Sequence, residues 1–164
     1  MSSKRRSYEA GHSPKFLVVI DDTPECDRAT YFASRRALRT GASVIMLRVI
    51  EIQDRNQQWL GVADIMRAEA HEEANSVLDR HAARISSITG VTPERVIREG
   101  EKADEMLKLI DEDEDIAALI LAAGTGKEGP GPLVSSLAKT AGDFPIPVAI
   151  VPGHLSDEDL DTMS

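Results

Sequence analysis

The apolar run from Lys15 to Asp21 (KFLVVID) constrains the fold more than any other segment of the chain. Its valines and isoleucine follow one another without the polar alternation of a half-exposed strand, so the run predicts a strand that is buried on both faces. Thr23 and Pro24 follow as an expected helix N-cap and first helical residue, and apolar residues recur at helical spacing until Gly41. The chain is therefore expected to begin with a central parallel strand and a helix.

The same alternation continues to the end of the chain. The further strands are expected at 43–50, 95–98, 116–122 and 146–151, and the later helices end near Gly90 or span 103–110 and 133–141. Strands that alternate with helices predict an α/β fold, a doubly wound five-stranded parallel sheet with helices on both faces and right-handed crossovers. Ligands of such sheets bind beyond the carboxyl ends of the strands, where the strand order reverses.

A glycine-rich loop follows the expected strand 116–122. The segment 124–129 (GTGKEG) matches the dinucleotide pattern G-x-G-x-x-G, but Pro130-Gly131-Pro132 follows where a helix should open, and Lys127 does not belong to a Walker A motif. Backbone N–H groups in such a loop can hold an anionic ligand. A phosphate-binding loop and a simple connecting loop are both consistent with this segment.

Length and composition limit the number of domains, the cellular location and the class of partner. The 164 residues suit one domain, here 15–152, with a flexible N-terminal tail over 1–14 and an acidic C-terminal tail over 153–164. No signal peptide and no membrane-inserting segment are expected, which predicts a cytoplasmic protein. A net charge of −9 argues against nucleic acid as a general partner. Proteins and small molecules are the expected partners.

The order of these elements resembles the universal stress protein family over residues 15–152. The resemblance is carried by VVIDDT after the first strand, by the Arg28-Ala29-x3-Ala33-x3-Ala37 helix face, by LRVIE, by the glycine loop and by the proline-flanked ending FPIPVAIV. It implies strand order 3-2-1-4-5, homodimers, and a regulatory role in stress physiology rather than established catalysis. Members of the family divide into those that bind ATP and those that do not.

The resemblance also implies a nucleotide site. Members that bind ATP carry G-x2-G-x9-G-[ST] after strand four; Gly124 and Ser136 match its ends, but Lys127 replaces the second glycine, Ser135 replaces the last, and the loop is shorter. Asp21 matches the family aspartate near the nucleoside, and Val49 matches the residue whose backbone meets adenine. The predicted site for ATP or AMP, with Mg²⁺ as a companion ion, comprises Asp21, Asp22, Val49, Gly124, Gly126, Lys127, Gly129, Ser135 and Ser136.

Two other functions remain open at this stage. A homodimeric interaction module that binds an unknown protein partner and no nucleotide is favoured by Glu128, which would repel phosphate. Weak nucleotide hydrolysis is the third alternative, although no general base or metal-binding carboxylate pair is evident beyond Asp21 and Asp22. In either case the apolar strand Ile146–Val151 lies at the sheet edge and is the expected dimer contact.

A few side chains have simpler interpretations. Cys26 near the start of the first helix is expected to be a quiet thiol, and His81 is expected to pack in the core. Ser135 and Ser136 are expected to cap the fourth helix, and the acidic run 111–115 to form a solvated turn. Trp59 is expected in the core or at an interface rather than over the site as a lid.

Overall fold

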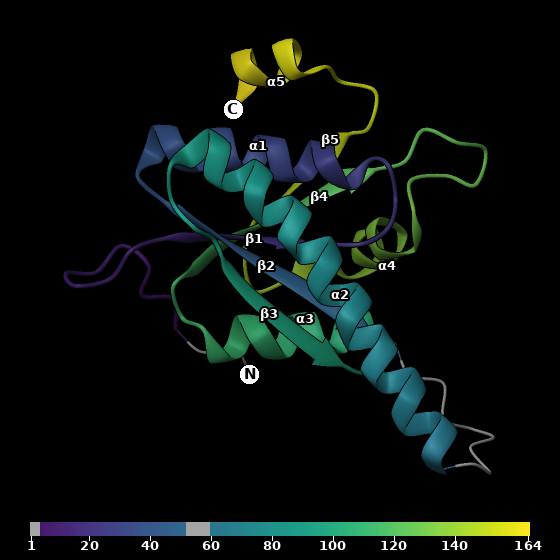
Figure 1. Cartoon of the computed structure of the whole chain (residues 1–164). Coiled ribbons are helices and arrows are strands. Elements are labelled where there is room, and N and C mark those ends of the chain that lie inside the picture. The colour runs from purple at the N-terminus through teal and green to yellow at the C-terminus, as the bar shows by residue number, and fades with distance from the viewer. Residues whose placement is uncertain (1–3, 52–59) are drawn as a thin grey trace.

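The structure, a computed structural model, describes residues 4–51 and 60–164, so Trp59 lies outside the described residues. Strands and helices alternate along the chain, and Figure 1 shows the sheet at the centre with helices around it. The elements are β1 (Lys15–Val19), α1 (Cys26–Thr40), β2 (Ser43–Ile50), α2 (Leu60–Thr89), β3 (Glu94–Glu99), α3 (Lys102–Glu112), β4 (Ile116–Ala123), α4 (Pro132–Thr140), a 3-10 turn η1 (Ala141–Asp143), β5 (Val148–Pro152) and α5 (Asp157–Met163).

The sheet has five parallel strands in the order β3-β2-β1-β4-β5, which confirms the predicted fold class and strand order. β1 is central as its apolar run predicts: Leu17 pairs with Ile45 of β2 on one side and with Leu119 of β4 on the other. The strand order reverses between β1 and β4, so their carboxyl ends define the switch point at which ligands of such sheets bind.

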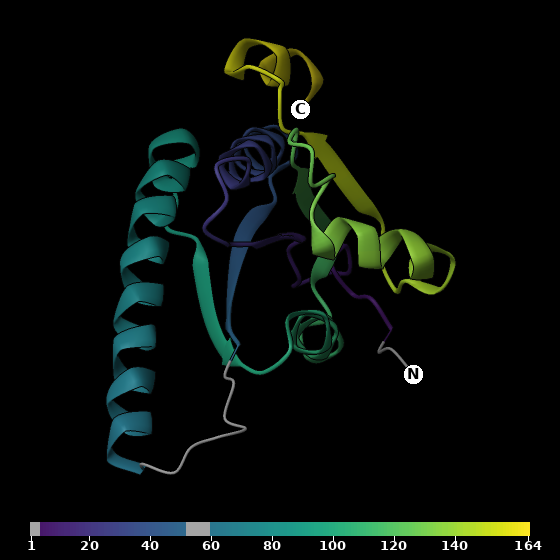
Figure 2. The ribbon, with the colours of Figure 1, turned by 90° about the vertical axis from the view of Figure 1, so that its right-hand side faces the viewer.

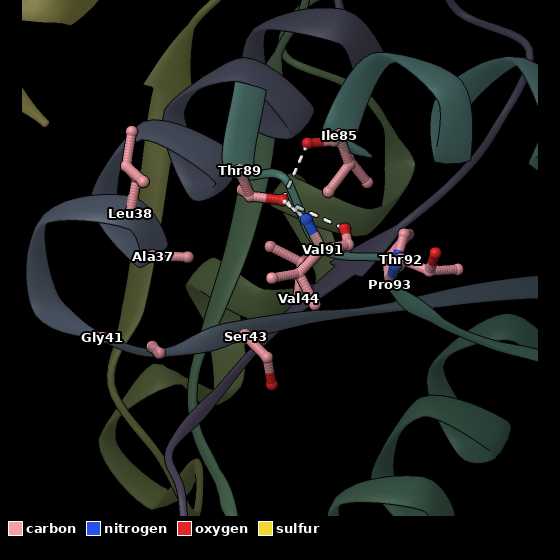
Figure 3. A pocket seen from close by; sticks show the side chains of 11 residues that line it. Ala37, Leu38, Gly41, Ser43, Val44, Ile85, Thr89, Val91, Thr92 and Pro93 are labelled. Carbon is pink, nitrogen blue, oxygen red and sulfur yellow. Dashed lines mark hydrogen bonds between the residues drawn. The ribbon is translucent and has the colours of Figure 1, made fainter. Parts of the chain in front are cut away.

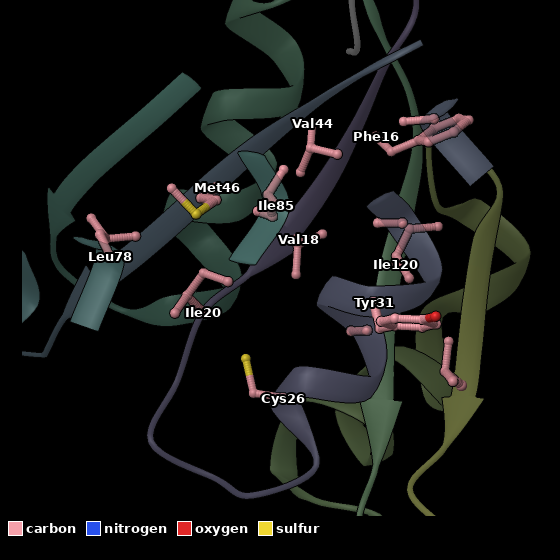
Figure 4. Close-up of a cluster of buried hydrophobic side chains, with 14 of the residues drawn as sticks. Phe16, Val18, Ile20, Cys26, Tyr31, Val44, Met46, Leu78, Ile85 and Ile120 are labelled. Atoms are coloured by element: carbon pink, nitrogen blue, oxygen red, sulfur yellow. The ribbon is translucent and has the colours of Figure 1, made fainter. Parts of the chain in front are cut away.

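Alternate residues of each strand enter two separate cores. One cluster, drawn in Figure 4, packs Val18 and Met46 of the sheet against α1 and α2. The other packs Leu17 and Leu47 against α3 and α4. Figure 2 shows the same division, with α1 and α2 on one side of the sheet and α3 and α4 on the other. Both faces of β1 are thus covered, which explains why its sequence is apolar at every position.

One predicted helix start and one predicted capping role are wrong. α1 begins at Cys26 with Glu25 as its N-cap, because the Asp21 carboxylate accepts hydrogen bonds from the N–H and Oγ1 of Thr23 and holds the preceding residues in a turn. α4 begins at Pro132 after Gly131, whose φ of 110° suits glycine alone, so Ser135 lies inside the helix and caps nothing. The same holds for Ser136.

Both ends of the chain carry structure beyond the sheet. The N–H of Arg6 donates to the carbonyl of Glu114, Lys15 forms an ion pair with Asp113, and His12 Nδ1 lies 2.6 Å from Asp115 Oδ1, so the acidic run is only partly solvated. After β5, the acidic segment forms the helix α5, which the sequence analysis did not predict. A capping box between Ser156 and Asp159 starts this helix.

Candidate functional site

The loops after β1 and β4 face each other at the switch point and enclose a small cavity of about 60 Å³. Its walls come from four parts of the chain that are far apart in sequence. These parts are the β1 loop with the start of α1, the first residue of α3, the end of β4, and the glycine loop with the start of α4. The polar and loop residues that line the cavity are Asp21, Thr23, Glu25, Lys102, Pro130, Gly131 and Pro132.

Asp21 is the predicted site residue that lines this cavity. Its Oδ1 already accepts two hydrogen bonds from Thr23, at 2.9 Å from the backbone N and 2.5 Å from Oγ1. Asp22 points elsewhere, because its carboxylate pairs with Arg48 Nη2 at 3.0 Å. Val49 lies near the carboxyl end of β2 with its side chain buried, so only its backbone is suited to meet a ligand.

The glycine loop closes on itself. The N–H of Gly124 donates to the carbonyl of Pro130 at 3.1 Å, and the N–H of Gly129 donates to the carbonyl of Gly126 at 3.1 Å. Gly129 has a φ of 91°, a left-handed conformation that favours glycine. Two of the donors expected to hold phosphate are thus used within the loop.

The remaining predicted phosphate ligands lie on the surface around the loop. Gly126 and Lys127 are exposed at the tip of the loop. Ser135 and Ser136 are exposed on α4, and neither belongs to the described lining of the cavity. The structure therefore places Asp21 and the second half of the loop at one cavity, and leaves these four residues outside it.

Glu25 is a part of the site that the sequence analysis missed. Its Oε2 lies 3.0 Å from the position that a Cβ of residue 124 would occupy, and its own Cβ lies 3.1 Å from the corresponding position at residue 153. Gly124 and Gly153 therefore make room for the Glu25 side chain. The carboxylate consequently lies against the loop that the sequence predicts to bind phosphate.

Lys102 is the second residue that the sequence analysis missed. It is the first residue of α3, and it lines the same cavity as Asp21 and Glu25. Its position directly after the carboxyl end of β3 was a usable signal, because all parallel strands end at this edge of the sheet. Lys102 brings a positive charge to a cavity that otherwise carries two carboxylates.

Cys26 also lines the cavity but is buried, with its Sγ 3.8 Å from the carbonyl of Val19. Burial raises the pKa of the Cys26 thiol to about 12, although hydrogen bonds with the Asp21 backbone and the Thr30 side chain act in the opposite direction. The thiol is neutral at physiological pH, which agrees with the predicted quiet cysteine.

His81 lies half-buried between α2 and α1, as predicted. Its Nδ1 is 3.2 Å from Oγ1 of Thr30, which is fully buried and also donates to the carbonyl of Cys26. Burial lowers the pKa of His81. The pair resembles a hydroxyl with a base, but no substrate can reach the buried hydroxyl, so it is a packing contact.

The size of the switch-point cavity limits what it can hold as it stands. Pockets for small molecules and cofactors usually measure roughly 300–1,000 Å³. A cavity of about 60 Å³ admits a few atoms only. A nucleotide would therefore fit only if a wall of the cavity moved; outward movement of the loop from Gly124 to Pro132 would break the hydrogen bond between Gly124 and Pro130.

A larger hollow of about 220 Å³ lies at the opposite end of the sheet (Figure 3). The ends of α1 and α2 and the starts of β2 and β3 line it, including Ala37, Leu38, Val44, Ile85 and Val91. The described residues in its wall carry no charged side chain. Phosphate would find no counter-charge there, so this hollow is unsuited to a nucleotide.

The described residues offer neither a metal-binding cluster nor a membrane-spanning helix. Within residues 4–51 and 60–164, no three His, Cys, Asp or Glu side chains gather where they could hold a metal ion. Likewise, none of the described helices combines the length and apolar character that a membrane span requires.

Comparison with known proteins gives consistent results. Universal stress protein UspA from Lactobacillus plantarum has the same fold with a TM-score of 0.69 at 15% identity, over 84% of this chain and 97% of that chain. A universal stress protein in complex with cAMP matches with a TM-score of 0.57 at 18% identity, over 84% and 96%. The Archaeoglobus fulgidus universal stress protein in complex with dAMP matches with 0.54 at 18%, over 84% and 96%.

These similarities to solved structures concern the fold. No curated protein matches the chain by sequence. The model of the universal stress protein family, in contrast, matches residues 13–152, which is most of the chain and nearly the range over which the sequence was found to resemble this family. The protein described here is a member of the universal stress protein family.

Proposed function

We propose that the chain binds an adenine nucleotide, ATP or AMP, at the switch point between β1 and β4. The observation that carries this proposal is the shared cavity, in which Asp21 from the β1 loop and Gly131 from the β4 loop line one wall each. Two proteins of the same fold are complexes with cAMP and dAMP. In this role the chain acts in the cytoplasm as a regulatory module of the stress response.

Each predicted residue has a role in this proposal. The Asp21 carboxylate accepts a hydrogen bond from a ribose hydroxyl, and the backbone at Val49 meets the adenine ring. Lys102 and Lys127 neutralise phosphate, and the N–H groups of the opened loop, from Gly124 to Gly131, donate to it. Ser135 and Ser136 on α4 would reach a phosphate only after that opening.

Mg²⁺ would accompany a triphosphate rather than reside in the protein. Mg²⁺ is usually bound through one or two carboxylates together with substrate phosphates, and Asp21 could supply one such oxygen. Asp22 could supply another only by leaving Arg48, with which it pairs at 3.0 Å.

Native mass spectrometry of freshly purified protein, followed by calorimetric titration with ATP, AMP and adenosine, tests the proposal. We expect dissociation constants in the micromolar to submillimolar range, because opening the loop costs free energy that binding must supply. Asp21→Asn should weaken all three ligands, whereas Asp143→Asn, an exposed change outside the site, should leave them unaltered. No heat and no retained nucleotide at millimolar concentration would contradict the proposal.

A second candidate function is favoured by the Glu25 carboxylate beside Gly124 and by the closed loop. In this alternative the chain is a homodimeric module that binds another protein and no nucleotide. β5 supplies the dimer contact in both candidates, because it is an edge strand and its Ile150 is 45% exposed. The titration with ATP distinguishes the two functions.

A further inference from the structure

The C-terminal helix α5 lies on the outer surface of α1, on the side away from the sheet (Figures 1 and 2). Leu160 of α5 is only 1% exposed and joins the core cluster of α1 and α2, and Leu155 packs partly against the same cluster. Hydrogen bonds and ion pairs also join this C-terminal segment to the two helices. The helix therefore covers a surface that would otherwise face solvent.

The covered surface is cationic and carries one aromatic ring. Arg28, Tyr31, Arg35 and Arg39 are spaced three, four and four residues apart, so they form one stripe along α1. Arg84 of α2 lies beside this stripe. The guanidinium carbons of Arg28 and Arg84 stand 5.6 and 5.0 Å from the centre of the Tyr31 ring. We call these five residues the arginine face.

Acidic side chains of α5 match the arginine face at two points. Asp157 Oδ1 lies 2.6 Å from Arg28 Nη2 and 3.5 Å from Arg84 Nη2. Asp161, one helical turn later, accepts from the Tyr31 hydroxyl at 2.6 Å and lies 3.0 Å from Arg35 Nε. The two carboxylates flank Leu160, so α5 presents an acidic and apolar pattern to this surface.

Backbone oxygens complete the match. Arg28 donates to the carbonyl of Leu155 at 2.9 Å. Arg39 donates to oxygens of Asp161 and Ser164, each at 2.6 Å. Because these donors contact backbone oxygens, a different helix in the same place could accept the same hydrogen bonds, whatever side chains it carries.

α5 is attached weakly enough that another molecule can displace it. α5 has seven residues, fewer than a helix needs to be stable on its own in water. The side chains of Asp157 and Asp161 are 50% and 39% exposed, and ion pairs at such positions contribute little and weaken with salt. One fully buried leucine supplies the main apolar contact.

We propose that the arginine face is a docking surface for an acidic amphipathic helix of a partner protein, and that α5 occupies this surface until such a helix displaces it. Charge complementarity supports this occupant, because four arginines gather here on a chain whose net charge is −9. Asp27 of α1, which pairs with Arg28 and Arg84 at 2.6 Å each, offsets one of these charges and leaves the surface positive. The partner helix carries a leucine with an acidic residue on each side, at the spacing of Asp157, Leu160 and Asp161.

The test uses the full chain and two matched variants. Asp157→Asn with Asp161→Asn removes the two carboxylates that touch the arginine face. Glu158→Gln with Glu73→Gln removes the same charge from exposed residues. Hydrogen exchange measures the protection of the α5 amides, and amide chemical shifts of the ¹⁵N-labelled protein report binding of a synthetic peptide that has the sequence of residues 153–164.

In the Asp157→Asn, Asp161→Asn variant we expect loss of α5 protection and peptide binding at least tenfold tighter than in the unaltered protein, with shifts on α1 and α2. A peptide with glutamate at the position of Leu160 should not bind. The proposal is wrong if α5 stays protected, or if it is released and the peptide still does not bind.

The proposal would also be overturned if a different kind of molecule occupied the arginine face. A released variant that binds vesicles of anionic phospholipid but not the peptide would identify a membrane-binding surface. A released variant that forms a dimer by exchanging α5 between copies, detected by light scattering, would assign the surface to a second copy of the chain.

Discussion

Glu25 holds its carboxylate against Gly124, with Oε2 3.0 Å from the place where a side chain at residue 124 would begin. The two residues are 99 positions apart and belong to the two loops that meet at the switch point. A carboxylate in this position repels a phosphate group brought into the glycine loop. The Glu25 carboxylate therefore lowers the affinity for a ligand more strongly when the ligand carries more phosphate groups.

This relationship predicts a change in ligand preference. Glu25→Gln should strengthen ATP binding about three- to tenfold, since two charges several ångströms apart near a protein surface interact by roughly one kcal/mol. Adenosine, which has no phosphate, should bind equally well to both proteins. Calorimetric titration of both ligands measures the ratio, with Glu73→Gln as a control of equal charge on the exposed surface of α2. An unchanged ratio of ATP to adenosine affinity would show that Glu25 does not face the phosphates.

Gly153 gives a prediction about stability. A Cβ at this residue would lie 2.5 Å from the carbonyl oxygen of Ala123, a backbone atom that cannot move aside cheaply. Gly153→Ala should lower the free energy of unfolding by about 1–3 kcal/mol because of this overlap. Gly142→Ala is the matched control, because a Cβ there meets nothing within 4 Å. Urea denaturation of both variants decides the point, and equal stabilities would mean that the contact between Gly153 and Ala123 relaxes freely.

The Cys26 thiol should resist modification in the folded protein. A shift of its pKa from 9.0 to about 12 reduces the thiolate fraction at pH 8 by about a thousandfold. Reaction with a disulfide reagent should be correspondingly slow in buffer and fast in urea. Because the folded state favours the neutral thiol, this residue's contribution to stability is present below the unfolded pKa and is lost as the pH rises above it. Rapid labelling of the folded protein would contradict the buried position.

His81 predicts a loss of stability in mild acid. Burial lowers its pKa from 6.5, so the unfolded chain binds the proton more readily, and stability falls as the pH falls below that value. The unaltered protein should lose more unfolding free energy between pH 7 and pH 5 than His81→Gln does. His154→Gln, an exposed change, should behave like the unaltered protein. Urea denaturation at the two pH values measures all three, and identical losses would exclude His81 as the cause.

The strands could be predicted from the sequence because they depend on local composition, whereas their order was implied by the resemblance to the family. Lys15–Val19 and Ile116–Ala123 are apolar at nearly every position, which only a strand with both faces covered requires. The helix α5 could not be predicted in the same way. Its seven residues carry no apolar stripe, and it forms where Leu160 and Asp161 meet the arginine face, which the fold must first assemble.

The candidate site was predicted only in part for a similar reason. The carboxyl ends of parallel strands meet at one edge, so Asp21 and the glycine loop could be placed together from the sequence. Glu25 and Lys102 also reach that edge, from the starts of two helices. The place of Lys102 after the third strand was a signal, but no motif marks either residue. The hydrogen bond from Gly124 to Pro130 depends on the backbone path through the loop, which residue types alone do not determine.

The last prediction concerns the proposed dimer. The N–H of Leu119 donates to the carbonyl of Pro147. Because successive residues of a strand point their backbone groups to opposite sides, the N–H of Ala149 faces β4 and the N–H of Ile150 faces the open edge of the sheet. A charged side chain on an edge strand discourages pairing with another strand. Ile150→Lys should therefore give a monomer with a stability close to that of the unaltered protein.

Light scattering of the unaltered protein and of two variants measures this outcome. Ile65→Lys is the control, because Ile65 is 60% exposed on α2, on a different part of the surface. The control should remain a dimer, and Ile150→Lys should not. If the unaltered protein is a monomer, or if Ile150→Lys is still a dimer, β5 does not join two copies. The reason is that an isologous pairing of edge strands places Ile150 of each copy next to the β5 strand of the other copy.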